Sequence, residues 1–251
     1  MKQYIISLFI LIISWFTMLA GTDSLLIKGN DYYKAGNYEK ATRSYETIID
    51  SGYESAFLYF NLGNAYYKSG KLAKAILNYE RAKKLAPYNE DIAYNLDMAK
   101  SFVIDKLEEI SPVFFRSWYT NIVLFISSDA WAYLSLICFI GGLLLMLLYF
   151  FTRKLSLKKS GFWFGVLLLL IAVGSFQFSK QNKKIMTSHD WAIIMSPSVT
   201  GKTTPDAGGK DFFVLHEGTK VNVEDKIGEW VEIKLSDGNK GWVQAEAVEV
   251  I

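Results

Sequence analysis

The sequence predicts a multidomain membrane protein, with an all-α helical-repeat domain first, two transmembrane helices in the middle and a small all-β barrel last. Three observations predict this order: a regular internal repeat in the first half, two long uncharged apolar runs, and short alternating segments between turn residues near the end. The 251 residues are 51% hydrophobic, which excludes a disordered chain.

The first 21 residues have the layout of a secretory signal peptide or an N-terminal anchor. Lys2 precedes the uncharged apolar stretch 4–20, and Gly21 follows it. We expect this segment to deliver the next domain across a membrane.

Residues 23–110 are predicted to form the helical-repeat domain, because small and aromatic residues recur at one constant offset. The pairs that lie at this offset are Gly29 and Gly63, Tyr32 and Tyr66, Gly36 and Gly70, Ala41 and Ala75, and Tyr45 and Tyr79. Small residues let paired helices approach, tyrosines fill the space between them, and glycine suits the turns. The offset and these residues resemble the tetratricopeptide repeat, whose period is about 34 residues.

Two such repeats cannot bury their faces alone, so a third element is needed. The segment that begins at Asn89 has apolar residues in a helical pattern through Phe102. It predicts a capping helix that continues towards Glu109 and ends before Ser111 and Pro112.

Residues 130–151 and 161–178 are the predicted transmembrane helices. Both runs are uncharged, and as helices they would be about 33 Å and about 27 Å long. Ser128 and Asp129 offer the N-cap of the first helix. The aromatic segment 112–127 is predicted to lie along the membrane surface.

The charge distribution predicts the topology. Residues 152–184 carry seven Lys or Arg and no acidic residue, four of them in the predicted loop 152–160 between the helices. Because basic loops stay in the cytoplasm, both flanking domains are predicted on the periplasmic (extracytoplasmic) side of a bacterial inner membrane. The smaller basic cluster Lys180, Lys183 and Lys184 opposes this orientation. The basic residues of this segment are interleaved with uncharged apolar sequence, which argues against a nucleic-acid partner.

Residues 186–251 are predicted to form a small barrel of five short strands, with a hairpin turn at Asp237 and Gly238. The predicted strands cover residues 191–195, 220–223, 230–234, 241–243 and 248–251. The amino-acid sequences of the segments 213–221, 228–233 and 237–243 are similar to those of bacterial SH3 domains.

The whole arrangement resembles the E component of the Bacteroides aerotolerance (Bat) operons, with particular likeness in the segments 89–96, 128–132 and 215–218. The resemblance implies an accessory role in an envelope complex linked to stress or oxygen tolerance. It also implies protein partners from the same operon, among them a MoxR-type AAA+ ATPase and membrane-anchored von Willebrand factor A domain proteins.

The sequence predicts no enzyme, no metal site and no cofactor. The chain has two histidines, His189 and His216, which excludes a three-histidine metal site, and His216 is expected to be structural or solvent-facing. Cys138 lies in an apolar run, where a thiol ionises poorly. The segment 201–204, Gly-Lys-Thr-Thr, lacks the earlier glycine of a phosphate-binding loop, and we expect it to be an ordinary loop.

The first helices of the repeats are predicted to line a groove that binds a protein partner. The candidate residues are Asn30, Tyr33, Lys34, Phe57, Phe60, Asn61, Asn64, Tyr67 and Lys68. Its asparagines are similar to the carboxylate clamp of chaperone-binding repeats, but Leu26 and Asp91 stand where the basic residues of that clamp would be. The alternative is that Tyr33 and Tyr67 only pack within an array that spaces its neighbours.

In the barrel, Phe212 and Trp242 are the candidates for an exposed ligand platform, because most large side chains of so small a domain are needed in its core. The sequence thus predicts a non-enzymatic, membrane-anchored adaptor. The first alternative is a sensor that binds peptidoglycan through the C-terminal domain, and the second is an enzyme that uses His216.

Overall fold

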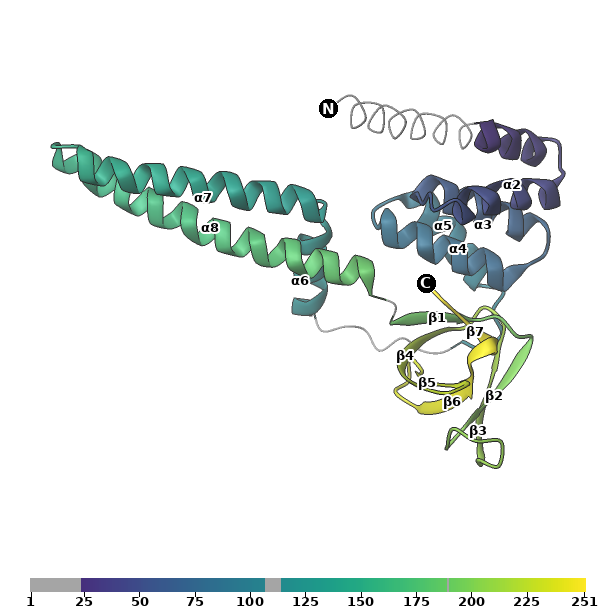
Figure 1. Ribbon diagram of the computed structural model, residues 1–251. Coiled ribbons are helices and arrows are strands. Elements are labelled where there is room, and N and C mark those ends of the chain that lie inside the picture. The colour runs from purple at the N-terminus through teal and green to yellow at the C-terminus, as the bar shows by residue number, and fades with distance from the viewer. Residues whose placement is uncertain (1–23, 107–113, 189) are drawn as a thin grey trace, which may run out of the picture. The chain divides into compact units, whose positions relative to one another are not determined.

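The computed structural model describes residues 24–106, 114–188 and 190–251, and Figure 1 shows their helices and strands. The chain divides into two compact units. One unit joins Met1–Ile110 to His189–Ile251, and the other is Ser111–Ser188. The predicted signal or anchor, residues 1–21, lies outside the described residues.

The first unit begins with antiparallel helix pairs, as the repeat predicted. A helix over residues 24–34 is followed by α2 (Tyr38–Asp50), α3 (Ala56–Lys68), α4 (Leu72–Leu85) and α5 (Glu90–Lys100). Side-chain oxygens of Asn37, Ser55 and Asn89 accept a backbone N–H in the first turns of α2, α3 and α5. These caps satisfy donors that the helix itself leaves without partners.

The repeated glycines and tyrosines pack as expected. A Cβ at Gly29 would lie 2.5 Å from Cε1 of Tyr45, and a Cβ at Gly63 would lie 2.7 Å from Cδ1 of Tyr79. Both tyrosines are 1% exposed. Gly36 sits in its turn at φ 75°, a conformation that side chains with a Cβ disfavour. Each repeat therefore closes by placing one ring against one glycine.

The capping helix is shorter than predicted. Helix α5 ends at Lys100, and the side chain and backbone N–H of Ser101 cap its last carbonyls. Val103 then turns into the core of the repeats, with 8% exposure, so the chain leaves the helical path there. The expected helical continuation was wrong over residues 101–106, because Val103 and Asp105 are used in tertiary contacts, and Glu109 lies outside the described residues.

The second unit contains α6 (Phe114–Leu124), α7 (Ser128–Phe151) and α8 (Leu155–Thr187). Helices α7 and α8 lie side by side in Figure 1, joined by a short turn. By length and composition both are apolar enough to cross a membrane. The side-chain oxygen of Ser127, one residue before the predicted cap, accepts from the N–H of Ala130 at the start of α7.

Small and polar residues join α7 to α8. A Cβ at Gly142 would lie 3.2 Å from the carbonyl oxygen of Gly165, so the two helices approach closely where these glycines meet. Ser135 Oγ donates to the Ala172 carbonyl at 2.8 Å. Asn182, 3% exposed, donates to the carbonyl of Val123 at 2.8 Å and ties α6 to α8.

Helix α8 is longer than the apolar run that predicted it. It begins at Leu155, so Lys158 and Lys159 lie on its first turns and not in the predicted loop 152–160. Its last turns carry Lys180, Lys183 and Lys184. Lysine and glutamine have high helix propensity, and the hydropathy window could not detect these turns as helix.

The first unit ends in an antiparallel sheet of seven strands, in the order β3-β2-β6-β5-β4-β1-β7. The strands are β1 (Trp191–Ile194), β2 (Ser198–Lys202), β3 (Asp211–His216), β4 (Lys220–Ile227), β5 (Trp230–Lys234), β6 (Lys240–Gln244) and β7 (Val248–Val250). Its core is formed by the buried residues Ala192, Ile194, Leu215, Val221, Val231, Ile233, Leu235 and Val243. This antiparallel sheet agrees with the predicted SH3-like domain, but over residues 190–251 it is not closed, and β3 and β7 lie at its edges.

The sequence missed β2 and β3, and it placed Gly201 and Lys202 in a loop. Both residues belong to β2, which has too few apolar residues to alternate visibly. The position of β2 depends on packing against Phe213. A Cβ at Gly201 would lie 2.0 Å from the ring of Phe213, and a Cβ at Gly241 would lie 2.8 Å from the same ring. One aromatic ring thus covers glycines on two neighbouring strands, β2 and β6.

The ring-on-glycine packing predicts a specific loss of stability. Gly63→Ala pushes a methyl group into the Tyr79 ring and should lower the free energy of unfolding by about 1–3 kcal/mol. Lys68→Ala on the same helix is the control, with an expected change within about 0.5 kcal/mol. Denaturant unfolding of both variants in detergent micelles measures the difference, and equal stabilities would contradict the packing argument.

Candidate functional site

Asparagine and tyrosine side chains form a repeated hydrogen-bonded ladder along the first helices of the repeats. Tyr45 Oη donates to Asn30 Oδ1 at 2.7 Å, and Tyr79 Oη donates to Asn64 Oδ1 at the same distance. Burial, with a smaller contribution from Tyr33, raises the pKa of Tyr45 to about 12, so its hydroxyl remains a donor at neutral pH.

The same oxygens accept a second hydrogen bond from the next helix. Asn61 Nδ2 donates to Asn30 Oδ1 at 3.4 Å, and Asn95 Nδ2 donates to Asn64 Oδ1 at 2.8 Å. Asn95 was missed as a member of this set, although it follows Asn61 by one full repeat period. The predicted asparagines Asn30, Asn61 and Asn64 therefore belong to this hydrogen-bonded ladder. Their hydrogen bonds link neighbouring helices to one another.

The other predicted groove residues differ in exposure. Phe60 packs in the core with its ring 6.0 Å from that of Tyr79. Tyr33 and Tyr67 are half-buried, and the Tyr67 ring lies 6.3 Å from that of Phe102, which is exposed. The exposed candidates are Lys34, Phe57 and Lys68. These three side chains, with the outer edges of the two tyrosines, are the part of the candidate groove that a partner can reach.

A buried carboxylate joins the helical repeats to the sheet within the first unit. The Glu80 side chain on α4 is 6% exposed. Lys100 Nζ on α5 lies 2.7 Å from its Oε1, and Lys220 Nζ on β4 lies 2.7 Å from its Oε2. Burial opposes ionisation, but the charges of Lys220 and Lys100 outweigh it and lower the pKa of Glu80. One ionised carboxylate thus holds α4, α5 and β4.

A second carboxylate, Asp105, receives three hydrogen bonds from the sheet. Thr219 Oγ1 and the His216 N–H both donate to Asp105 Oδ2 at 2.6 Å, and His216 Nδ1 lies 2.9 Å from Oδ1. Burial raises the pKa of Asp105, but the hydrogen bonds from Thr219 and His216 lower it more. His216, the histidine expected to be structural, is used in this contact.

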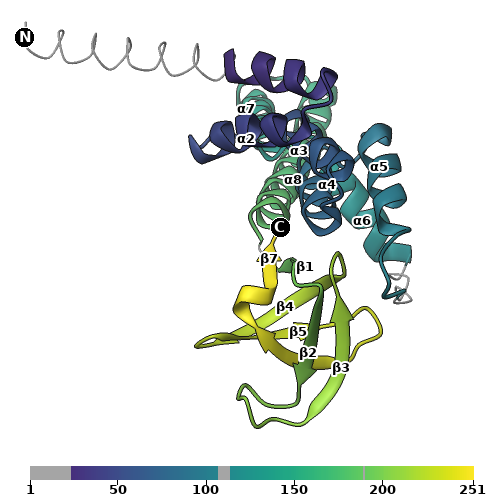
Figure 2. The same ribbon diagram turned by 90° about the vertical axis from the view of Figure 1, so that its right-hand side faces the viewer.

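Apolar groups complete the contact between the repeats and the sheet. Ile193 of β1 belongs to the same buried cluster as the helical core, with Met195 packed against it. A Cβ at Gly218 would lie 2.9 Å from Cδ1 of Ile76 and 3.0 Å from Cγ2 of Val103. Figures 1 and 2 both show β1 and β7 as the strands nearest the repeats. The two modules therefore share one core.

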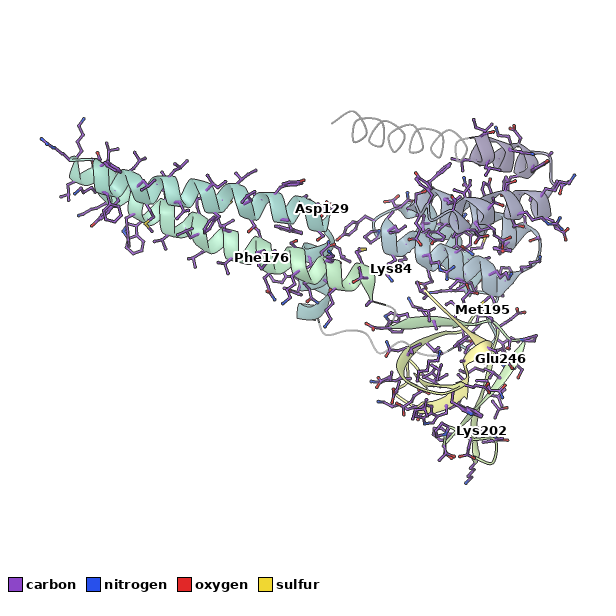
Figure 3. All side chains as sticks on the ribbon, in the orientation of Figure 1. Lys84, Asp129, Phe176, Met195, Lys202 and Glu246 are labelled. Carbon is purple, nitrogen blue, oxygen red and sulfur yellow. The ribbon has the colours of Figure 1, made fainter. Side chains whose placement is uncertain are left out.

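The predicted platform residues lie on β3 and β6, with β2 between them. Phe212 is 54% exposed, whereas Phe213 covers the glycines inside the sheet. Lys202 of β2 pairs with Trp242 in the sheet register, and its ammonium group lies 3.0 Å from Asp211 Oδ1. Figure 3 shows Lys202 at the end of the sheet away from the repeats and Met195 at the end beside them.

The described residues contain no group of three or more metal-ligating side chains. Cys138 is buried in α7. His216 Nδ1 faces the Asp105 carboxylate at 2.9 Å.

Comparison with protein families gives two matches, one for the helical repeats and one for the sheet. Residues 28–90 match the family model of the tetratricopeptide repeat, and residues 202–249 match that of the bacterial SH3 domain. No curated protein matches the chain. The chain therefore combines tetratricopeptide repeats with a bacterial SH3 domain, and both families are interaction modules.

The hydrogen bonds to Asp105 predict that the stability of the folded protein depends on pH. Because folding lowers the pKa of Asp105, its ionised carboxylate stabilises the folded protein. This contribution is complete above the ordinary pKa of 3.8 and declines as the pH falls below 3.8 towards the lowered pKa. Asp105→Asn should cost about 1–3 kcal/mol at neutral pH, and this difference should shrink as the pH falls through that range. Asp97→Asn, at an exposed position of α5, is the control. Thermal unfolding across the acid range measures both, and a pH-independent difference would contradict the assignment.

Proposed function

We propose that the chain is a non-enzymatic, membrane-anchored adaptor that binds a protein partner through the groove of its tetratricopeptide repeats. The observation that carries the proposal is the exposed set Lys34, Phe57 and Lys68, presented on first helices that the asparagine ladder holds in fixed register. Rigid repeats bind peptides and proteins with little ordering cost, because the surface is already formed.

The resemblance to the Bat operon E component supports the choice of partner. It points to the von Willebrand factor A domain proteins of the same membrane and to the MoxR-type ATPase of the same operon. The adaptor would serve an envelope complex in stress or oxygen tolerance. The matched repeat and SH3 families support the interaction role that this proposal needs.

The membrane anchor in this proposal is the hairpin of α7 and α8. Both helices have the length and composition to span a bilayer, and the turn between them carries Arg153 and Lys154. Because basic residues beside short loops are retained in the cytoplasm, this turn is placed inside and both flanking modules outside. The lysines at the end of α8 oppose this orientation, and the basic residues around the turn outnumber them.

A second candidate function is binding of cell-wall peptidoglycan by the sheet. The supporting observation is an exposed apolar patch on β3, where Phe212 and Val214 are 54% and 52% exposed. Trp242 lies across β2 from them. Exposed aromatic rings stack on the apolar faces of other groups, which supports this candidate.

The groove assignment predicts the effect of two charge reversals. Lys34→Glu with Lys68→Glu should weaken capture of the von Willebrand factor A proteins from solubilised membranes at least about tenfold, because both charges face the partner. The matched control is Lys28→Glu with Lys40→Glu, which changes the same charge beside Tyr32 on another face of the repeats. Quantitative pull-down by the tagged full chain measures capture. Equal losses in the two pairs would refute the groove.

The cell-wall candidate predicts a loss on removing one ring. Phe212→Ser should reduce sedimentation of the protein with purified peptidoglycan by roughly tenfold, since the stacked area is lost. Ile227→Ser, at a position of β4 that is 51% exposed, is the control. If wild-type protein does not sediment with the wall, or if Phe212→Ser sediments as well as the control, the sheet is not a wall-binding module.

A further inference from the structure

The repeat places two glutamates at equivalent positions on the second helices of the pairs. Glu46 on α2 and Glu80 on α4 are one repeat period apart, and so are Tyr66 and Lys100 on the following helices. The structure uses these positions alike. Lys100 holds Glu80 Oε1, and Tyr66 Oη donates to Glu46 Oε1.

The two glutamates differ in what binds their second oxygen. Glu80 Oε2 receives Lys220, a lysine from a β-strand outside the repeats, at 2.7 Å. Among the described residues, no donor occupies the corresponding position at Glu46 Oε2. Glu46 instead lines an open cavity of about 180 Å³ formed by α2, α3 and α4 together with Glu249 of β7. The first repeat therefore has the same carboxylate and an open space where the second has a lysine.

The oxygen of a buried amide that lines this cavity also lacks a hydrogen-bond partner among the described residues. Asn78 is 3% exposed, and its Nδ2 donates to the Lys74 carbonyl at 2.8 Å. Its Oδ1 is buried and accepts no hydrogen bond from any residue that the structure describes. An unsatisfied buried acceptor costs free energy, and a ligand with an N–H group would satisfy it.

The charges around the cavity favour a cation. Three carboxylates, Glu46, Asp50 and Glu249, face two basic side chains, Lys74 and Arg81. Arg81 is already engaged, because it donates to Glu249 Oε1 at 3.2 Å and to the Val250 carbonyl at 2.7 Å. The Lys74 ammonium lies 5.3 Å from the centre of the Tyr66 ring. Among the described residues, the acceptors left without a hydrogen-bond partner are Glu46 Oε2, the Asp50 carboxylate and Asn78 Oδ1.

The apolar part of the lining suits an aliphatic stem. Ile49, Leu62 and Leu77 contribute to the walls beside the carboxylates. A lysine side chain combines four methylene groups with one ammonium group and buries its stem on such surfaces while its charge meets an acid. A phosphate or carboxylate ligand would be repelled by the carboxylates of Glu46, Asp50 and Glu249.

We propose that the cavity between α2 and α4 binds a lysine side chain of a protein partner, with Glu46 as the acceptor of its ammonium group, as Glu80 accepts Lys220 within the chain. Asp50 and Asn78 Oδ1 supply further acceptors. The cavity lies on the second helices of the repeats, whereas the groove proposed above lies on the first helices. A partner can therefore lose one contact and keep the other.

The test uses the full chain in detergent micelles and a capped peptide that copies residues 218–223, Gly-Thr-Lys-Val-Asn-Val. Two further probes are the same peptide with norleucine in place of lysine, and n-butylamine. Isothermal titration calorimetry should show saturable binding of the lysine peptide only. Glu46→Gln, which keeps the shape of the side chain, should weaken it at least about tenfold because a charge-assisted hydrogen bond is lost.

Two more variants make the result specific. Asp50→Asn changes an exposed residue, is expected to fold normally, and should weaken the lysine peptide about two- to fivefold. Glu39→Gln, an exposed acid in the first turn of α2, should leave binding unchanged, and so should the Lys34→Glu and Lys68→Glu pair.

Several outcomes would overturn the proposal. They are failure of the lysine peptide to bind, equal affinity for the norleucine peptide, and unchanged affinity in Glu46→Gln. Butylamine that binds as tightly as the peptide would assign the cavity to small amines and not to a protein. An affinity that changes in the Lys34→Glu and Lys68→Glu pair, in either direction, would place the peptide in the groove instead.

Discussion

The Glu80 carboxylate is the interaction on which the first unit depends. It is buried between the repeats and the sheet, and it is tolerable there because Lys100 and Lys220 each contribute one ammonium group at 2.7 Å. A buried carboxylate without such partners would be strongly destabilising. The ion pairs with Lys100 and Lys220 join α4 to α5 and to the start of β4. The hydrogen bonds to Asp105 and the packing of Ile193 in the helical core then follow at the same contact.

The shared core changes the meaning of the domain order. Along the sequence, the repeats and the SH3 domain are separated by the two apolar helices, and nothing in that order requires them to touch. The structure joins residues from both sides of the hairpin into one unit. A partner bound at the repeats and a ligand bound at the sheet would therefore act on the same compact unit. That coupling is what an adaptor with two recognition surfaces needs.

Much of the fold could be predicted because local patterns specify it. The constant offset that relates Gly29 to Gly63 and Tyr45 to Tyr79 predicted the helix pairs, since each ring needs a facing glycine. The uncharged runs predicted α7 and α8. The end of α5 and the strand β2 were not predicted, because Val103 and Gly201 are placed by distant residues, the helical core and Phe213.

The candidate site was predictable in its members and less so in their roles. The repeat register identified Asn30, Asn61 and Asn64 as neighbours, but their bonds to Tyr45, Tyr79 and Asn95 are visible only in three dimensions. Asp105 and His216, which are 111 residues apart, meet through tertiary structure alone. The equivalence of Glu46 and Glu80 was present in the sequence, yet only the contact with Lys220 gives that equivalence a chemical meaning.

The most direct test of the shared core is hydrogen–deuterium exchange of the full chain with and without Glu80→Gln. Glu80→Gln removes the negative charge and replaces one accepting oxygen by an NH2 donor, so one of the two ammonium groups loses its acceptor and both lose the opposite charge. The contact should therefore loosen on both sides at once. The account predicts faster exchange in α4 and α5 and, in the same variant, in β1 and β4. Faster exchange in the helices while both strands keep their wild-type protection would contradict the claim that the repeats and the sheet form one unit.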